Sequence, residues 1–235
     1  MTPGMTPCMT PRMTPEEFSR RFDVSRETCA RLEAYVALLT RWNSRINLVA
    51  PTTIETAWTR HIVDSAQLFD LAPKSASRWI DLGSGAGLPG LPVAALAAEK
   101  APGLRVTLVE SDTRKAAFLA TAAREMGLRV TIEPQRIEAL AARPYDVVSA
   151  RALAPLDRLC ALADRFSARH TGRHTGGDTC NQTGPGTIFL FPKGAKLDLE
   201  LTVAADHWHI HAERIASQTD PAATVLRILE LEPRR

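Results

Sequence analysis

The 235-residue chain contains no apolar run that could cross a bilayer. No stretch approaches the roughly 20 consecutive apolar residues that a membrane-spanning helix needs, and the N-terminus has no apolar signal region. Aromatic residues make up only 6% of the chain, but 45% of the residues are hydrophobic and 23% are charged, as in ordinary globular proteins. These features argue against a membrane-spanning, fibrous or disordered protein, and we expect a cytoplasmic one.

Cysteine is scarce and dispersed along the chain. Cys8, Cys29, Cys160 and Cys180 form no C-x-x-C pair, so the sequence suggests neither a disulfide framework nor a zinc ribbon, and we expect reduced thiols. The formal net charge of +3 is also smaller than the strong basic excess of a dedicated nucleic-acid-binding domain. Composition therefore leaves the function to be found in local motifs.

Four Met-Thr-Pro repeats occupy residues 1–15, where a proline at every fourth position prevents a helix. We expect this segment to be a disordered tail. Thr14 to Glu17 then have the S/T-x-x-E spacing of a capping box, with proline at the first helical position. The pattern predicts one helical segment over about 16–43 and another over about 54–69, which together form an N-terminal helical extension over 16–70.

Beyond residue 74, short apolar runs alternate with helical stretches. This alternation is typical of βαβ units and predicts an α/β fold with a doubly wound, mostly parallel sheet over 74–235. The expected parallel strands, with helical segments between the first four and over about 155–166 before the fifth, are 78–82, 105–110, 129–132, 145–149 and 187–191. Two later runs, 207–211 and 224–230, are expected to pair antiparallel at an edge. The stretch at about 168–186, rich in glycine and threonine, is interpreted as a flexible insertion.

Three glycines, Gly83, Gly85 and Gly87, stand at every second position between the first expected strand and the next helix. A glycine-rich turn at this place presents free backbone N–H groups and the positive end of a helix, so it predicts a site for a polar or anionic ligand. The dinucleotide fingerprint G-x-G-x-x-G is not met, because Leu88 occupies the position of its third glycine. The alternative is that the glycines only make a tight connection.

Two acidic residues favour one particular ligand. Glu110 ends the second expected strand and could accept hydrogen bonds from a ribose diol, a feature that serves NAD and S-adenosylmethionine equally. Asp81 lies two residues before the first glycine, where a carboxylate suits the cationic amino group of S-adenosylmethionine and would repel a pyrophosphate. We therefore expect S-adenosylmethionine as the cofactor, with both acids and the three glycines in its site.

The glycine turn belongs to a longer pattern of motifs. They are Asp81-x-Gly83-x-Gly85-x-Gly87-Leu88-Pro89-Gly90-x-Pro92, Glu110-Ser111, Arg114-Lys115, Phe118-Leu119, Ser149-Ala150-Arg151-Ala152 and Lys193-Gly194, preceded by Trp42-Asn43, Asn47-Leu48 and Arg60-His61-Ile62-Val63-Asp64-Ser65. This pattern resembles the RsmG family (glucose-inhibited division protein B), bacterial enzymes that methylate N7 of one guanosine in 16S ribosomal RNA. The chain departs from the family in the insertion and near Thr224, where the family often has an arginine.

The resemblance implies a Rossmann-like class I methyltransferase that uses S-adenosylmethionine. Its partner would be 16S ribosomal RNA, within the small subunit or an assembly intermediate, and the protein would act as a monomer. The resemblance assigns five residues to contact with S-adenosylmethionine: Gly83, Leu88, Ile137, Glu138 and Arg151. The residues expected to face the RNA are Asn47, His61, Asp64 and Lys193.

Arg151 and Lys193 are the two cations expected to position the reactants. Arginine commonly reads guanine through O6 and N7 together, but that mode would block the nucleophile, so Arg151 is expected on the cofactor carboxylate, on O6 or on a phosphate. Lys193 follows the fifth expected strand and could take a phosphate as a point charge. Each could instead be an ordinary solvated side chain, and His61 and Asp64 could be a surface pair on one helical face.

No catalytic acid or base is expected. N7 of guanine carries a lone pair and no proton, so its methylation requires positioning more than proton removal. The segment SARALAP after the fourth expected strand also lacks the Asn/Asp-Pro-Pro-aromatic pattern of amino-group methylation. A small-molecule methyltransferase and a nucleotide-binding regulator without transfer activity are the alternatives.

No metal site is expected either. Three histidines over 207–211 alternate with apolar residues, which predicts a half-buried strand with histidine on its solvent face. Further potential ligands lie in the insertion, which offers no fixed scaffold: His170, His174, Asp178 and Cys180.

Overall fold

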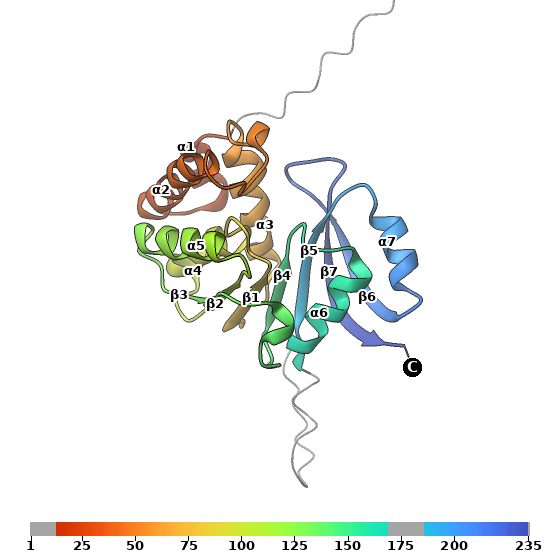
Figure 1. Cartoon of the computed structure of the whole chain (residues 1–235). Helices are drawn as coiled ribbons and strands as arrows, with labels where there is room; N and C mark the ends of the chain where they lie inside the picture. Colours follow the sequence, from red (N-terminus) through yellow and green to blue (C-terminus); the bar gives the residue numbers. More distant parts are fainter. Residues whose placement is uncertain (1–12, 169–185, 235) are drawn as a thin grey trace, which may run out of the picture.

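The computed structural model describes residues 13–168 and 186–234, which form a seven-stranded sheet with helices on both faces (Figure 1). The strands are β1 (Arg78–Leu82), β2 (Arg105–Val109), β3 (Val130–Glu133), β4 (Val147–Ala150), β5 (Ile188–Lys193), β6 (Trp208–Ala216) and β7 (Thr224–Pro233). Their order is β3-β2-β1-β4-β5-β7-β6. Strands β1 to β5 pair in parallel, whereas β7 runs antiparallel to β5 and β6 antiparallel to β7. The predicted mostly parallel sheet and its antiparallel edge are confirmed.

The strand order reverses between β1 and β4. The chain continues from β1 to β2 and β3 on one side, and β4 and β5 lie on the other. The connections that leave the carboxyl ends of β1 and β4 therefore diverge, and such a divergence leaves a crevice in open α/β sheets. The glycine turn follows β1 and Arg151 follows β4, so topology brings both to this crevice.

The helices are α1 (Pro15–Phe22), α2 (Arg26–Asn43), α3 (Asp64–Leu71), α4 (Gly90–Lys100), α5 (Thr113–Glu125), α6 (Leu156–Ala163) and α7 (Leu197–Ala204). The expected capping box begins α1, with reciprocal hydrogen bonds between Thr14 and Glu17. The single helix predicted over 16–43 is wrong, because Asp23 adopts a φ of 48° and Ser25 caps a new helix. Periodicity missed the break because both helices bury side chains in the same apolar cluster.

Two further helical predictions changed in detail. The segment predicted over 54–69 contains a π-helical turn, Trp58–Val63, that leads directly into α3. The helix expected between β3 and β4 is wrong, since that connection contains only the 3-10 turn Ile137–Ala139. The short connection leaves residues 135–138 beside the crevice instead of covering the sheet there with a helix.

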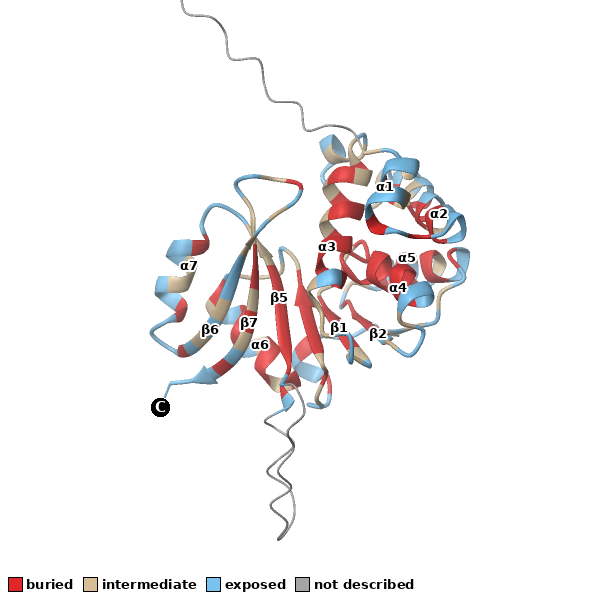
Figure 2. Ribbon diagram, turned by 180° about the vertical axis from the view of Figure 1, so that it is seen from behind, coloured by how far each residue is buried: buried red, intermediate tan, exposed pale blue. Residues whose placement is uncertain are grey.

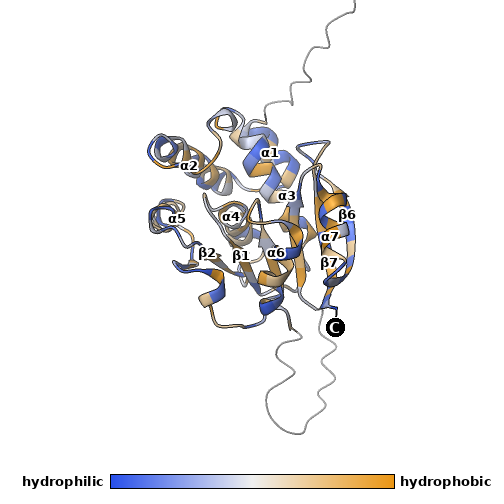
Figure 3. Ribbon diagram, turned by 45° about the vertical axis from the view of Figure 1, so that its right-hand side comes forward, coloured by the Kyte–Doolittle hydropathy of each residue, from blue (hydrophilic) through white to orange (hydrophobic). Residues whose placement is uncertain are grey.

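Two apolar layers flank the sheet. Neighbouring residues of β1, Trp79 and Ile80, are fully buried on opposite faces and belong to different clusters. Helices α1 to α5 contribute to the Trp79 cluster, and α6 and α7 contribute to the Ile80 cluster. Figure 2 shows the buried residues along β1, β5 and α3, and Figure 3 shows hydrophobic residues concentrated on the strands. The helical extension therefore packs on one face of the sheet and shares its core.

Several predictions concern residues outside the described part of the chain, namely 1–12 and 169–185, which include Cys8, Cys180 and the possible ligands of the insertion. Cys29 and Cys160 are free and buried. Within the described ranges, no helix is both long and apolar enough to cross a membrane. The predicted histidine-bearing strand is confirmed as β6, although it begins one residue later than predicted: Trp208 is buried, and His209 and His211 are exposed.

Candidate functional site

Three glycines in a left-handed conformation build the turn between β1 and α4. Gly83, Gly85 and Gly87 have φ values of 66°, 55° and 84°, which L side chains rarely adopt. A Cβ on Gly87 would lie 2.4 Å from Cδ1 of Leu91, so this glycine is needed for close packing on α4. A Cβ on Gly85 would have only the carbonyl oxygen of Gly83 within 4 Å, at 3.8 Å, and would project into open space.

Asp81 supports this turn from behind. Its side chain is fully buried, and its carboxylate accepts hydrogen bonds from Oγ of Ser149 at 2.8 Å and from the N–H of Gly90 at 3.3 Å. Nε1 of Trp79 in turn donates to Oγ of Ser149 at 2.8 Å. Burial raises the pKa of Asp81 to about 6, against the lowering effect of these hydrogen bonds. The expectation that Asp81 faces a ligand is therefore corrected, because its carboxylate fixes the end of β1 and does not reach the crevice.

Two other side chains also hydrogen-bond to the backbone of the turn. The hydroxyl of Tyr35, on α2, donates to the carbonyl of Ala86 at 2.7 Å. The Glu110 carboxylate accepts from the N–H of Gly85 at 2.8 Å and, through its other oxygen, from the N–H of Asp112 at 2.8 Å. The helical extension and the end of β2 thus fix the turn in place.

A cavity of about 590 Å³ opens beside the glycine turn. Its walls come from the turn, from the ends of β2 and β4, from the connection after β3 and from the loop that precedes α3. The residues predicted for the cofactor site that line this cavity are Gly83, Gly85, Leu88, Glu110, Ile137, Glu138 and Arg151. Asp81 and Gly87 act behind it, so the structure brings most of the predicted set together at one site.

Arg151 lies in the wall that separates this cavity from a second one. Its Nη2 donates to the carbonyl of Arg60 at 3.3 Å and to Nδ1 of His61 at 3.2 Å. Its Nη1 lies 3.3 Å from Oδ2 of Asp64 in an ion pair, yet this buried nitrogen has no hydrogen-bond partner among the described residues. The guanidinium is therefore held by Arg60, His61 and Asp64, and its buried Nη1 is left without a hydrogen bond to any described residue.

His61 is held as a neutral hydrogen-bond acceptor. Because arginine only donates, the contact with Arg151 makes Nδ1 of His61 the acceptor and places the ring proton on Nε2. Nε2 then donates to Oγ1 of Thr53 at 2.8 Å, and that hydroxyl donates to the carbonyl of Ala50 at 2.7 Å. Burial, with the charge of Arg151, lowers the pKa of His61 to about 4. The structure thus places His61 in the wall of the first cavity, and its contact with RNA stays a prediction.

Asp64 contacts Arg151 from the other side. Its Oδ1 accepts from Nε2 of Gln67 at 2.8 Å and from Oγ1 of Thr219 at 2.9 Å. It lines the second cavity, not the first. His61 and Asp64 were predicted as a possible pair, and the structure links them through Arg151.

The second cavity, of about 530 Å³, lies between the loop after β4, the end of β5 and the connection from β6 to β7. Lys193 lines it, and its Nζ pairs with Oε2 of Glu200 at 2.5 Å and donates to the carbonyl of Ala154 at 3.2 Å. The Lys193 side chain is only 9% exposed. This placement does not fit the expected backbone-phosphate contact, because the ammonium is paired and faces a cavity instead of open solvent. Thr224, where the family often has an arginine, also lines this cavity.

Asn47 is exposed and lines neither cavity. Its neighbours Leu48 and Val49 do line the first one, and Oδ1 of Asn43 accepts from both of their N–H groups, at 3.0 and 2.9 Å. Asn43 therefore shapes this wall, although only Asn47 was predicted for the site.

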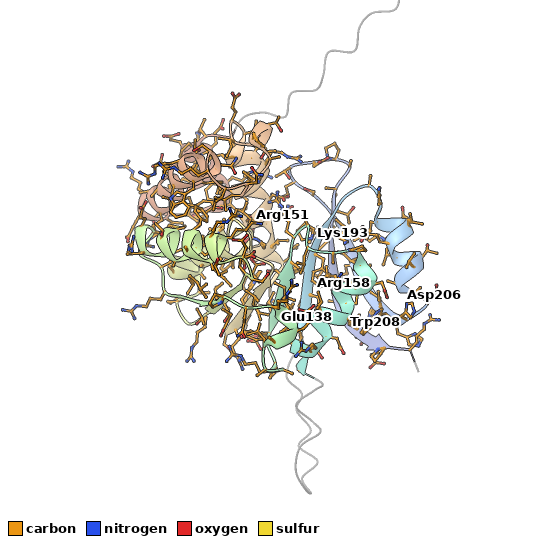
Figure 4. The ribbon with its side chains drawn as sticks, in the orientation of Figure 1. Glu138, Arg151, Arg158, Lys193, Asp206 and Trp208 are labelled. Atoms are coloured by element: carbon orange, nitrogen blue, oxygen red, sulfur yellow. The ribbon has the colours of Figure 1, made fainter. Side chains whose placement is uncertain are left out.

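Sequence reasoning also missed three cations at the first cavity: Lys115, Arg136 and Arg158. Lys115 stood in a recognised motif, and Arg136 directly precedes the predicted Ile137, but nothing in the sequence marked Arg158. Figure 4 shows Arg158 projecting from α6, with Glu138 nearby in this view and with Arg151 and Lys193 towards the carboxyl ends of β4 and β5.

The fold and the glycine turn define a class of protein. The structure resembles a putative O-methyltransferase from Klebsiella pneumoniae, with a TM-score of 0.53 and 15% identity over 92% of this chain and 96% of that chain. It also resembles magnesium protoporphyrin IX methyltransferase from Synechocystis PCC 6803 with bound SAM, with a TM-score of 0.51 and 15% identity over 88% and 98% of the two chains. The chain has the Rossmann-like fold of the class I S-adenosylmethionine-dependent methyltransferases.

Sequence comparison then gives the family. The GidB family model, described as rRNA small subunit methyltransferase G, matches residues 28–173. Relatives named ribosomal RNA small subunit methyltransferase G from Jannaschia sp. (strain CCS1) and Ruegeria sp. (strain TM1040) are 52% and 47% identical. These alignments cover 87% and 89% of this chain and 89% and 94% of the relatives. The chain belongs to the GidB family, which confirms the resemblance drawn from its motifs.

Proposed function

We propose that the protein transfers a methyl group from S-adenosylmethionine to N7 of one guanosine in 16S ribosomal RNA. Membership of the GidB family and the class I methyltransferase fold support the reaction and its cofactor. The observation that carries the proposal is the convergence of the glycine turn, Glu110 and Arg151 on one cavity, next to a second cavity that shares the Arg151 wall. One cavity can take a cofactor while the other takes a base.

The residues of the first cavity fit S-adenosylmethionine. Gly85 leaves open space that a side chain would fill, and the Glu110 oxygens each accept one backbone N–H, which leaves lone pairs for a ribose diol. The buried Nη1 of Arg151 lacks a hydrogen-bond partner among the described residues, and a carboxylate would provide one. When bound, S-adenosylmethionine supplies a methyl group on a positively charged sulfur.

The chain's own residues position the base without removing a proton. N7 of guanine has a lone pair and no hydrogen, so no general base is required. Methylation makes the base cationic, and the residues around Arg151 limit the charge that faces it, because Asp64 pairs with the guanidinium and His61 is neutral near pH 7. Arg151 therefore acts as a positioning residue.

Three cations at the rim of the first cavity would hold the RNA backbone. Lys115, Arg136 and Arg158 line it, and none of the three forms an ion pair with another described residue. Free cations of this kind suit phosphates. The proposed partner is 16S ribosomal RNA in the small subunit or an assembly intermediate, bound in the cytoplasm by the monomeric protein.

The test uses labelled S-adenosylmethionine and small subunits from cells in which the corresponding gene is deleted, with naked 16S ribosomal RNA in parallel. We expect label at N7 of one guanosine after the modified position is mapped. Label in ribosomal protein, at another atom of the base or only in small molecules would contradict the proposal.

A further inference from the structure

The second cavity contains one carboxylate that is partly free. Of the three acids that line it, Asp64 uses both oxygens in contacts with Arg151, Gln67 and Thr219. Asp220 also uses both, because Oδ2 pairs with Arg60 at 2.9 Å and Oδ1 accepts from the N–H of Ala222 at 2.9 Å.

The third acid, Glu200, uses only one oxygen. Its Oε2 pairs with Lys193 and accepts from the N–H of Leu156 at 2.8 Å, while Oε1 has no hydrogen-bond partner within the described ranges. The side chain is 25% exposed and lines the cavity. Oε1 is therefore an acceptor that can meet a bound ligand.

Lys193 supplies a matching donor beside this acceptor. An ammonium has three N–H donors, and Nζ of Lys193 directs two of them to Glu200 and to the carbonyl of Ala154. One donor remains. Ala154 belongs to the wall that the two cavities share, so Lys193 lies between that wall and Glu200.

The acceptor and the donor match the pairing edge of guanine. Guanine presents donors at N1 and N2 next to the O6 acceptor, and N7 lies on the other side of O6. We infer that Glu200 reads N1–H and the 2-amino group of the target guanine while Lys193 donates to O6, which leaves N7 towards the shared wall. Adenine would place its N1 acceptor and 6-amino donors against groups of the same kind, so it is rejected.

This inference rests on the proposed function, and it makes Glu200 the residue that determines base specificity. It also gives Lys193 a role that fits its burial and its ion pair better than a phosphate contact does. The charges of Glu200 and Lys193 cancel in their ion pair, so this pair brings no net positive charge to the methylated guanine. The base is then recognised by hydrogen bonds.

The experiment compares small subunits reconstituted with guanosine or inosine at the target position. Inosine lacks the 2-amino group but keeps N1–H, O6 and N7. We expect the wild-type protein to favour guanosine over inosine by about 10- to 100-fold in kcat/KM, the range expected for loss of a base contact. Glu200→Gln is expected to lose most of this preference, mainly through its activity on guanosine.

Asp198→Asn is the matched control, because it removes one carboxylate from the same helix at a position that lines neither cavity and pairs with Arg214. It should keep the wild-type ratio, and calorimetry should show unchanged affinity for S-adenosylmethionine in both variants. A guanosine-to-inosine ratio near one in the wild-type protein, or an unchanged ratio in Glu200→Gln, would overturn the inference and leave the proposed function standing. Failure of the wild-type protein to methylate guanosine subunits would overturn both.

Discussion

Single residues of the glycine turn have different tasks, although all three glycines share a positive φ. Gly87 is required because a Cβ would collide with Leu91, while Gly85 leaves space in the cavity. Asp81, on the strand before them, belongs to a buried hydrogen-bond network with Ser149 and Trp79. The same sequence motif therefore contains one residue that makes room for a ligand and others that fix the backbone around it.

Gly85→Val should abolish binding of S-adenosylmethionine and of its demethylated product, because the side chain would fill the cavity beside the turn. Gly127→Val is the matched control: Gly127 has a φ of 63°, a Cβ added to it would meet nothing within 4 Å, and it does not line the cavity. Both variants should lose stability from a side chain in the left-handed region, by about 1–2 kcal/mol. Calorimetry should detect loss of binding in Gly85→Val alone. Equal affinity in both variants, or tight NAD binding by the parent protein, would refute this assignment.

The elements of the fold explain how the helical extension reaches the site. The turn Trp58–Val63 and α3 carry His61 and Asp64, which hold Arg151 from two sides, and α2 carries Tyr35, which holds the glycine turn. The extension thus contributes to the architecture of both cavities. A substitution that destabilises the helical extension is therefore expected to weaken cofactor binding while the sheet stays intact.

The depressed pKa of His61 predicts a pH-dependent stability. Above its ordinary pKa of 6.5 the neutral ring contributes fully, and the contribution is lost as the pH falls towards the folded value of about 4, because the unfolded state takes up the proton first. The wild-type protein should therefore lose about 3 kcal/mol more unfolding free energy than His61→Gln between these pH values.

The measurement is the free energy of unfolding of each protein, obtained by chemical denaturation at several pH values. The quantity compared is the difference between the wild-type protein and His61→Gln. Asp81 has a raised pKa of about 6, so its contribution is full below its ordinary value of 3.8 and is lost as the pH rises through 6. Because Asp81 is present in both proteins, its contribution cancels in the difference between their free energies of unfolding. A difference that does not change with pH would show that His61 is protonated as easily in the folded protein as in the unfolded chain.

The sequence predicted the elements better than their local contacts. Alternating apolar runs predicted the strands, and the glycine motif predicted the position of the first cavity, because both signals depend on residue spacing along the chain. The break at Asp23 and the choice of Glu200 as the partner of Lys193 depend on tertiary packing, which no local pattern records. Asp81 was assigned to the cofactor because a carboxylate at its position suits an amino group. In the structure its side chain is buried and hydrogen-bonds to Ser149 and Gly90.

At the scale of the whole molecule, two cavities and a rim of cations occupy one region of the protein, along the carboxyl ends of the central strands. The first cavity has the glycine turn and Glu110, and the second has Lys193 and Glu200. The shared wall contains Arg151 and Ala154. In the proposed function, this arrangement would place the cofactor and the base in separate cavities and leave the RNA backbone to the cations at the rim.

Arg158→Ala should weaken RNA binding and flatten its salt dependence, because Arg158 is exposed at the rim and has no ion-pair partner among the residues described. Loss of one phosphate contact should reduce the slope of log affinity against log salt by about 0.7 to 0.9. Arg105→Ala, at the opposite end of β2, is the control and should leave the slope unchanged. Equal slopes for the two variants would show that Arg158 does not contact an RNA phosphate.

The central claim, that the site positions guanine N7 without a catalytic base, is tested most directly by the single-turnover rate of methyl transfer at saturating RNA and cofactor. One group with a shifted pKa in this region supports a flat profile, because His61, with a pKa of about 4, is neutral across the range. We predict a rate of methyl transfer that does not change between about pH 6.5 and 9. A bell-shaped profile in that step would contradict the account, because it would require an essential acid or base and would move the target from N7 to an amino or carbon position.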